Sequence, residues 1–467
     1  MSAAILCVAL LSAAQQPSSS EVMSVLEPTS GGLTTDEVIR RVLETSPEAM
    51  KAEVEHMKAA EEANTAWTGY APRVDLSAGY QRLSPITLPP CDPSLPEDEQ
   101  FFCLPPGVNQ NDVQGFGAFP LDSYSLVASV SVPASDYFLR IMPGYDAVVG
   151  TEEVARNQLA AKREEVAFTA VQMYLDAIRA RAGRVVAEKS VGVLTTQMED
   201  LQKLAEAGLS TNGDVLQVKA QVASAQVALE QAKGGVIVAN ARLRRALHDP
   251  QAKLEHGEDL LASANIELPE YEAALEQAIE DRFELRALRK LVDVQANFAK
   301  LERVGVFPRL TIDGSATHAR PNQRVFFDPT GFNTTWQIGV NLRWSPNDAV
   351  VGMSNWDNAD RDVALVETDI IALTDLIAVE VANALATMRS TRASILAARE
   401  GLEAAEGAFD DRKKLLDAGQ GTTRELLLAE QDLRNAELQI INAHLDLRLA
   451  RARLDRALGR LHKGDDR

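Results

Sequence analysis

The chain has 467 residues, 5% aromatic residues and a formal net charge of -20 at pH 7. This length allows one large core or several domains, and the low aromatic content suits long helices. The negative charge argues against nucleic acid and anionic lipid as partners, because both bind basic surfaces.

The first 14 residues are typical of a secretory signal peptide: an apolar run is followed by small residues and then a polar stretch. A basic segment before the apolar run is missing, which points to a misassigned start codon. The alternative to export is a disordered apolar tail. We expect residues 15–32 to be a flexible linker. Beyond the N-terminus no run of about 18 uncharged apolar residues occurs, so we expect no transmembrane helix.

Residues 33–268 form the first of two predicted repeats. An amphipathic helical stretch leads into two predicted strands, at about 70–83 and 119–133, where apolar and polar residues alternate. A long proline-free helical arm follows from about 146 to 207, and a break near 208–213 separates it from a second helix. We therefore expect a long helical hairpin with its tip near 208–213.

A proline-rich segment between these two strands holds Cys91 and Cys103. In an exported protein this arrangement predicts one disulfide that closes a surface loop. A two-cysteine metal site is the weaker alternative, because no histidine lies nearby.

Residues 269–461 repeat the same order, and residues 462–467 form a tail. A helical stretch precedes predicted strands at about 307–319 and 334–345. A second proline-free arm, from about 351 to 418, then leads to a predicted tip near 419–424 and a final helix.

The last helix of each repeat carries the same apolar heptad, and adding 211 to a residue number in the first gives its partner in the second. The first series is Val215, Val218, Val222, Ala225, Leu229, Ala232, Val236, Ala239, Leu243 and Ala246, and the second runs from Leu426 to Ala457. A 3-4 apolar spacing of this length indicates a helix with one narrow packing seam. The duplication indicates a fold of two similar halves.

Each predicted tip combines a helix-ending glycine with polar residues that begin the next helix. Gly208 and Gly419 stand where a left-handed residue is favoured. The N-cap candidates are Thr211, Asn212, Thr422 and Thr423. Asp214 and Glu425 fall in the first turn, where a carboxylate faces the helix dipole.

The four predicted strands each have one apolar and one polar face, and aromatic residues lie at their ends. These aromatic residues are Tyr70, Tyr80, Tyr124, Phe307, Trp336 and Trp344. This pattern is typical of lipid-facing barrel strands, and an ordinary soluble sheet is the alternative. A closed membrane barrel needs about eight or more strands, so a chain that supplies four must oligomerise to span a membrane.

The order and spacing of several short motifs resemble TolC-like outer-membrane efflux proteins. The motifs are Gly69–Tyr80 (GYAPRVDLSAGY), the tip at 207–217 (AGLSTNGDVLQ), the tip at 418–428 (AGQGTTRELLL), and the closing segments 241–247 (ARLRRAL) and 452–458 (ARLDRAL). The resemblance covers the chain from about Leu33 to Leu461.

This resemblance implies a mainly α fold with a small membrane β part. Three chains would give twelve strands in one outer-membrane barrel, continuous with a periplasmic α-barrel. The implied function is a passive exit duct of a tripartite efflux pump or type I secretion system, without enzymatic activity. Its implied partners are a periplasmic adaptor and, through the adaptor, an inner-membrane pump.

The resemblance also assigns roles at the tips. The adaptor-facing residues are Gly208, Leu209, Ser210, Gly419, Gln420 and Gly421. Asp214 and Glu425 match acidic entrance positions, and three copies of Glu425 would form an anionic constriction; a purely dipole-capping role is the compatible alternative. Leu416, Gly421 and Leu428 replace gate residues of some members, so that lock does not transfer, and Asp417 or Arg424 are the candidates to substitute.

The sequence contains no pattern that indicates cofactor chemistry. The six histidines are scattered without metal-ligand spacing, and no nucleotide-binding glycine motif is present. We expect no cofactor. The alternative function is a soluble periplasmic coiled-coil adaptor or scaffold, and an enzyme is a distant third.

Overall fold

The structure is a computed structural model that describes residues 23–84, 89–92, 94, 96, 103–104, 106–109, 121–208, 210–261, 268–325 and 331–461. The expected signal peptide, the first part of the linker, Leu209 and the tail lie outside these residues. Two compact units divide the chain: Met1–Met57, Val154–Leu288 and Asp369–Arg467 form one, and Lys58–Glu153 and Arg289–Thr368 form the other. Each unit holds matching parts of both repeats.

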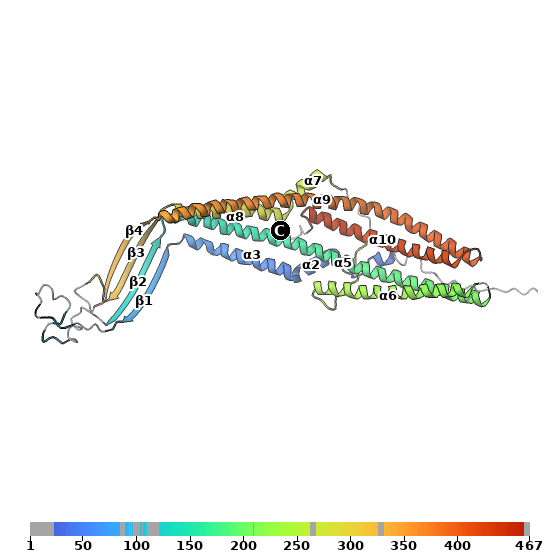
Figure 1. The fold of residues 1–467 in the computed structure, drawn as a ribbon, viewed down its shortest axis with the longest axis horizontal. Helices are drawn as coiled ribbons and strands as arrows, with labels where there is room; N and C mark the ends of the chain where they lie inside the picture. The colour runs from blue at the N-terminus through green and yellow to red at the C-terminus, as the bar shows by residue number, and fades with distance from the viewer. Residues whose placement is uncertain are drawn as a thin grey trace, which may run out of the picture. The chain divides into compact units, whose positions relative to one another are not determined.

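The second unit contains one antiparallel sheet in the order β1-β2-β3-β4 (Figure 1). Its strands are β1 (Arg73–Arg82), β2 (Asp122–Val132), β3 (Arg309–Arg320) and β4 (Asn333–Arg343). The four predicted strands are thus confirmed, with shorter bounds at most ends. Tyr70, expected in the first strand, lies instead in the short helix η2 (Trp67–Tyr70), and the strand begins only after Pro72, which has no N–H for a ladder.

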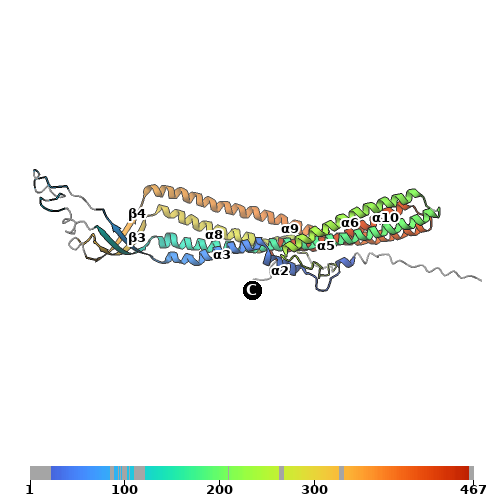
Figure 2. The same cartoon turned by 90° about the horizontal axis from the view of Figure 1, so that it is seen from below.

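Two long helical hairpins account for the proline-free tracts. The first consists of α5 (Met142–Glu206) and α6 (Asn212–Ala246), and the second of α9 (Pro346–Asp417) and α10 (Thr423–Ala457). α6 and α10 have 35 residues each, and their bounds differ by the offset of 211. Within the first unit, Figure 2 shows α6 and α10 beside α5. The helical prediction from the twin heptads is confirmed.

Shorter helices precede and connect these elements. They are η1 (Ser24–Leu26), α2 (Thr35–Thr45), α3 (Pro47–Ala66), η4 (Tyr137–Ile141), α7 (Tyr271–Asp281), α8 (Phe283–Arg303) and η5 (Val304–Val306). η4 is a π-helix that leads directly into α5.

The main core of the first unit is built around α5. Tyr174, Leu175 and Ile178 of α5 are almost completely buried with Leu243 of α6 and Leu445 of α10. α10 is therefore buried on two sides, against its hairpin partner and against the long helix of the other repeat.

α9 contains a segment that is long and apolar enough to cross a membrane by length and composition. It escaped the sequence criterion because Asp375 and Glu380 interrupt the apolar run. Ile377 and Val381 from this segment pack into a core with Leu454 of α10, as expected for a bundle helix.

Candidate functional site at the helical tips and the strand sheet

The first tip joins α5 to α6 through a left-handed glycine and a capping box. Gly208 has φ 74° and donates its N–H to the carbonyl of Ala205 at 3.0 Å. Thr211 is the N-cap: its hydroxyl accepts from the Asp214 N–H at 3.2 Å, and the Asp214 carboxylate accepts from the Thr211 N–H at 3.2 Å. Both ends of the turn thus satisfy backbone groups that a helix end leaves open.

The second tip repeats this design. Gly419 has φ 71°, and the N–H groups of Gln420 and Gly421 both donate to the carbonyl of Leu415, at 2.8 and 3.0 Å. A Cβ at Gly421 would lie 2.9 Å from the backbone nitrogen of Leu416, so a side chain has no room there. Gly421 stands where some TolC-like proteins have an arginine, and close backbone packing requires a glycine at this position.

The two acidic entrance candidates both act as capping residues in the structure. The Asp214 carboxylate also accepts from the Thr211 hydroxyl at 2.6 Å, and these hydrogen bonds lower the pKa of Asp214. Glu425 completes the box with Thr422 and lies 3.8 Å from Arg412 of α9. The side chains of Glu425 and Arg412 are about half exposed. The lowered pKa keeps the Asp214 carboxylate charged at the start of α6.

Asp417 and Arg424, the candidates for a substitute gate lock, are both exposed. Neither side chain makes a hydrogen bond or ion pair to the described part of this chain. Within the described part of one chain, neither Asp417 nor Arg424 therefore makes a bond that could serve as a gate lock.

A stripe of polar residues along α10 is a feature that the sequence reasoning missed. Thr423, Glu430, Glu437 and His444 recur every seventh residue, and all four are buried. Ser190 of α5 donates its hydroxyl to Glu430 at 2.5 Å, and Lys189 of α5 pairs with Glu437 at 2.5 Å. The seven-residue spacing is visible in the sequence, but charged residues on an amphipathic helix usually form its solvated face.

Burial shapes the protonation of these carboxylates. Burial raises the pKa of Glu430, against the hydrogen bond from Ser190 and the charge of Arg434. Burial likewise raises the pKa of Glu437; Lys189 opposes this effect, and Glu406 and Glu430 add to it. The seam between α5 and α10 therefore holds two buried carboxylates, Glu430 and Glu437, with Lys189 paired to Glu437 and Glu406 of α9 close enough to act on it. A lower pH favours the neutral forms of the two buried carboxylates.

The sheet has one apolar face, as the strand alternation predicts. The register places Leu76, Ala128, Ala316 and Trp336 in one cross-strand row, and neighbouring rows on that face are also mostly apolar. Leu76 is 76% exposed and Trp336 is 72% exposed. The other face is polar: Asp313 accepts from Ser131 at 2.6 Å and from Asn341 at 2.7 Å.

The aromatic residues fall at the two ends of this sheet. Tyr70, Phe307 and Trp344 flank the end where β1 and β3 begin and β4 finishes. Tyr80 and Tyr124 face each other at the opposite end, with ring centroids 5.0 Å apart. Trp336 lies toward that same end of β4. All six rings are exposed. Their role as an aromatic girdle on a membrane barrel stays a prediction.

Cys91 and Cys103 form a disulfide in the loop region between β1 and β2. Two backbone hydrogen bonds join the chain segments beside the disulfide. Cys91 donates its N–H to the carbonyl of Leu104 at 3.0 Å, and Leu104 donates its N–H to the carbonyl of Pro89 at 2.7 Å. Among the described residues no three His, Cys, Asp or Glu side chains are grouped as a metal site.

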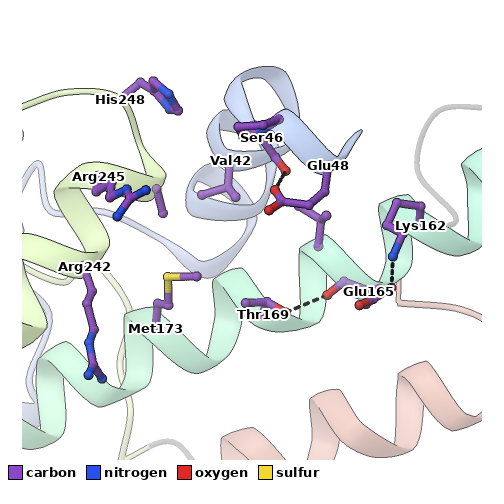
Figure 3. A pocket seen from close by; sticks show the side chains of 13 residues that line it. Val42, Ser46, Glu48, Lys162, Glu165, Thr169, Met173, Arg242, Arg245 and His248 are labelled. Atoms are coloured by element: carbon purple, nitrogen blue, oxygen red, sulfur yellow. Dashed lines mark hydrogen bonds and ion pairs between the residues drawn. The ribbon is translucent and has the colours of Figure 1, made fainter. Parts of the chain in front are cut away.

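An open groove of about 650 Å³ lies where α5 passes the end of α6 (Figure 3). Its wall includes Lys162 and Thr169 from α5, Arg242 and Arg245 from α6, and Glu48 from α3. Arg242 and Arg245 make no hydrogen bond or ion pair with any residue that the structure describes. The groove carries no arrangement of nucleophile, base and orienting group that would indicate catalysis.

The described geometry defines a class: a membrane-channel subunit that combines barrel strands with long helical hairpins. The family model for outer membrane efflux proteins matches residues 38–248 and 274–460. The outer membrane efflux protein BepC of Brucella suis is 24% identical over 309 residues, 66% of each protein. The outer membrane protein TolC of Vibrio cholerae is 21% identical over 437 residues, 92% of this chain and 91% of that protein. The solved structure of VceC from Vibrio cholerae has a TM-score of 0.71 at 18% identity and covers 96% of this chain and 100% of that one.

The chain therefore belongs to the outer membrane efflux protein family. It is an efflux channel of the TolC type in the bacterial outer membrane, with a periplasmic helical part, and it is not an enzyme. The family match covers both predicted repeats.

Proposed function

We propose that three copies of this chain form one exit duct. The observation that carries this proposal is the sheet: its apolar face is exposed, and its edge strands β1 and β4 have no further strand partner in the described chain. Four strands are too few to close a membrane barrel, whereas three copies supply twelve. The polar face, with Asp313 and Asn341, would then line a wet lumen.

The helical tips are proposed to dock a periplasmic adaptor that is joined to an inner-membrane pump of an efflux or type I secretion system. Each tip is a short turn fixed on both sides, by a left-handed glycine and by a capping box. Gly208, Gly419 and Gln420 are exposed at these turns. Such rigid turns hold a docking surface in place, and small residues there allow close backbone approach.

Glu425 is proposed to favour cations at the entrance. Three copies of its half-exposed carboxylate around one opening would concentrate cations by focusing the negative potential. Arg412, at 3.8 Å, offsets part of this charge in each chain.

The test is to express the chain with its signal peptide and separate inner and outer membranes. The proposal expects the protein in the outer-membrane fraction and discrete conductance steps after reconstitution into planar lipid bilayers. A water-soluble protein, or a membrane protein that conducts no ions in any reconstitution, would overturn the duct.

A further inference from the structure

The apolar face of the sheet ends in a row of aromatic rings that runs from β1 to the start of β4. Tyr80 of β1 and Tyr124 of β2 face each other. The ring centroid of Phe332, directly before β4, lies 6.0 Å from that of Tyr124 and 5.3 Å from that of His318 of β3, on which it stacks. The row lies at the end of the sheet where β1 finishes and β2 begins, away from the ends that join η2 and η4.

Arg320 belongs to the same row and has no acidic partner. It pairs with Tyr124 in the register of β2 and β3, so both side chains lie on the apolar face. Its guanidinium lies over the ring of Phe332, 6.0 Å from the centroid. The Arg320 side chain is exposed and makes no hydrogen bond or ion pair with any residue that the structure describes. Its N–H donors are therefore open to a ligand.

The charges on the apolar face gather at this one end. Within the four strands, the formally charged residues on this face are Arg82, Asp122 and Arg320. Arg82 donates to the Asp122 carboxylate at 3.1 Å, and the Tyr80 hydroxyl donates to it at 3.0 Å, so the charges of Arg82 and Asp122 offset each other. The net charge of -20 belongs to the whole chain, whereas Arg320 leaves this end of the face with one uncompensated positive charge.

The position of Arg320 along β3 matches the level of lipid headgroups. Leu310 and Leu342 form the last pair of this face at the end that joins the helices, and Arg320 follows Leu310 by ten residues. At about 3.3 Å per residue and a tilt of about 40°, this stretch rises roughly 25 Å, the height of the apolar band of a membrane barrel. Because the helical part is periplasmic, Arg320 would reach the surface of the outer leaflet.

We propose that this face binds the phosphate of a lipid headgroup in the outer leaflet, with Arg320 as the phosphate ligand and the rings of Tyr124 and Phe332 beside it. The proposal rests on the proposed barrel, since the face meets lipid only there. A guanidinium fits a phosphate because its planar donors bind two oxygens at once and its charge is permanent. Aromatic rings are favoured at the headgroup level. The contact with Phe332 restrains the arginine without using its N–H donors.

The site is complete within one chain. Tyr124 and Arg320 lie on β2 and β3, the two central strands, and not on the edge strands β1 and β4 (Figure 1). A duct of three copies would therefore carry three equivalent sites.

Native mass spectrometry of the protein purified in mild detergent and titrated with diphosphoryl lipid A tests the site. The wild type should retain up to three lipids, one for each chain. Lipid A without its phosphates is the matched ligand and should bind about 10- to 100-fold more weakly, as expected for the loss of a charge-assisted hydrogen bond. Arg320→Gln should show the same loss for the phosphorylated lipid. The control Arg343→Gln removes an exposed arginine from the polar face of β4 and should bind like the wild type.

The contrary outcomes are distinct from a failure of the duct. If Arg320→Gln retains diphosphoryl lipid A as well as the wild type does, or if the two lipids bind the wild type equally, Arg320 is not a phosphate ligand. If inorganic phosphate displaces the lipid at equal concentration, the site takes free phosphate and not a lipid. Each of these results overturns the inference and leaves the duct standing as long as the measured mass is that of three chains. The mass of a single chain overturns the duct itself.

Discussion

The buried ion pair between Lys189 and Glu437 allows a quantitative test of how α10 is held on α5. The Lys189 side chain is 11% exposed and that of Glu437 is 4% exposed, and the two charges are 2.5 Å apart. Lys189→Met keeps a long apolar stem but removes the cation. Glu437 then remains among Glu406 and Glu430, which already raise its pKa.

The size of the effect follows from proton uptake. A buried carboxylate without its cation is neutralised rather than left charged. Because the ordinary pKa of the group is 4.5, each pH unit above that value adds about 1.36 kcal/mol to the free energy of protonating Glu437. The loss of stability in Lys189→Met is therefore at most about 3.4 kcal/mol at pH 7 and about 1.4 kcal/mol at pH 5.5. The first value lies within the roughly 3–5 kcal/mol range measured for broken buried pairs.

The sign of the pH dependence is set by the raised pKa. A carboxyl whose pKa is higher in the folded protein contributes stability that is fully present below its ordinary value and is lost as pH rises through the folded value. The variant should therefore be closest to the wild type near pH 5 and fall furthest behind it at pH 7 and above.

Hydrogen exchange of α10 amides, corrected for the intrinsic rate at each pH, reports the local opening free energy. The double variant with Glu437→Leu should recover most of the loss, because an apolar pair replaces an ion pair at little cost. Lys203→Met is the matched control, since Lys203 and Asp200 form an exposed pair worth about 0.5 kcal/mol or less. A loss in Lys189→Met that does not change between pH 5.5 and 7 would refute the reasoning.

Three further predictions concern the tips. Gly421→Ala should destabilise the second tip by about 1–3 kcal/mol in hydrogen-exchange measurements, because its Cβ would meet the preceding turn. The control Gly407→Ala, which faces open space on α9, should be neutral or stabilising. Equal effects of the two substitutions would contradict the close packing at Gly421. Thr211→Ala and Thr422→Ala should each lower the stability of their helix by about 1 kcal/mol and speed amide exchange in its first turn, in α6 and α10 respectively. A loss of stability at only one of the two tips would contradict the equivalence of the two capping boxes. Glu425→Ala should lower cation selectivity in planar bilayers, and unchanged selectivity would leave this carboxylate as a cap only.

Much of the fold was predictable because its signals are periodic. The offset of 211 anticipated two helices whose bounds match to the residue, and the strand alternation anticipated which side chains share a face. The N-cap was narrowed by the structure to Thr211 and Thr422, since the choice between neighbouring polar residues depends on backbone geometry. Tyr70 was misplaced in a strand because alternation does not show where Pro72 delays the ladder.

The buried stripe on α10 was not predictable from one helix. Glu430 and Glu437 lie beside the apolar seam, where charged residues are usually solvated. Their burial depends on α5, which is far away in the sequence and brings Ser190 and Lys189 to them. The corresponding position on α6 holds Lys219, which is exposed.

The mass of the protein purified in mild detergent tests the central claim most directly. The sheet with its two open edges and exposed apolar face requires further copies to close a barrel. Native mass spectrometry should give three times the mass of one mature chain; the full sequence has a mass of 50.7 kDa, and cleavage of the predicted signal peptide would lower it. A mass of one chain, or of any number other than three, would contradict the twelve-stranded duct.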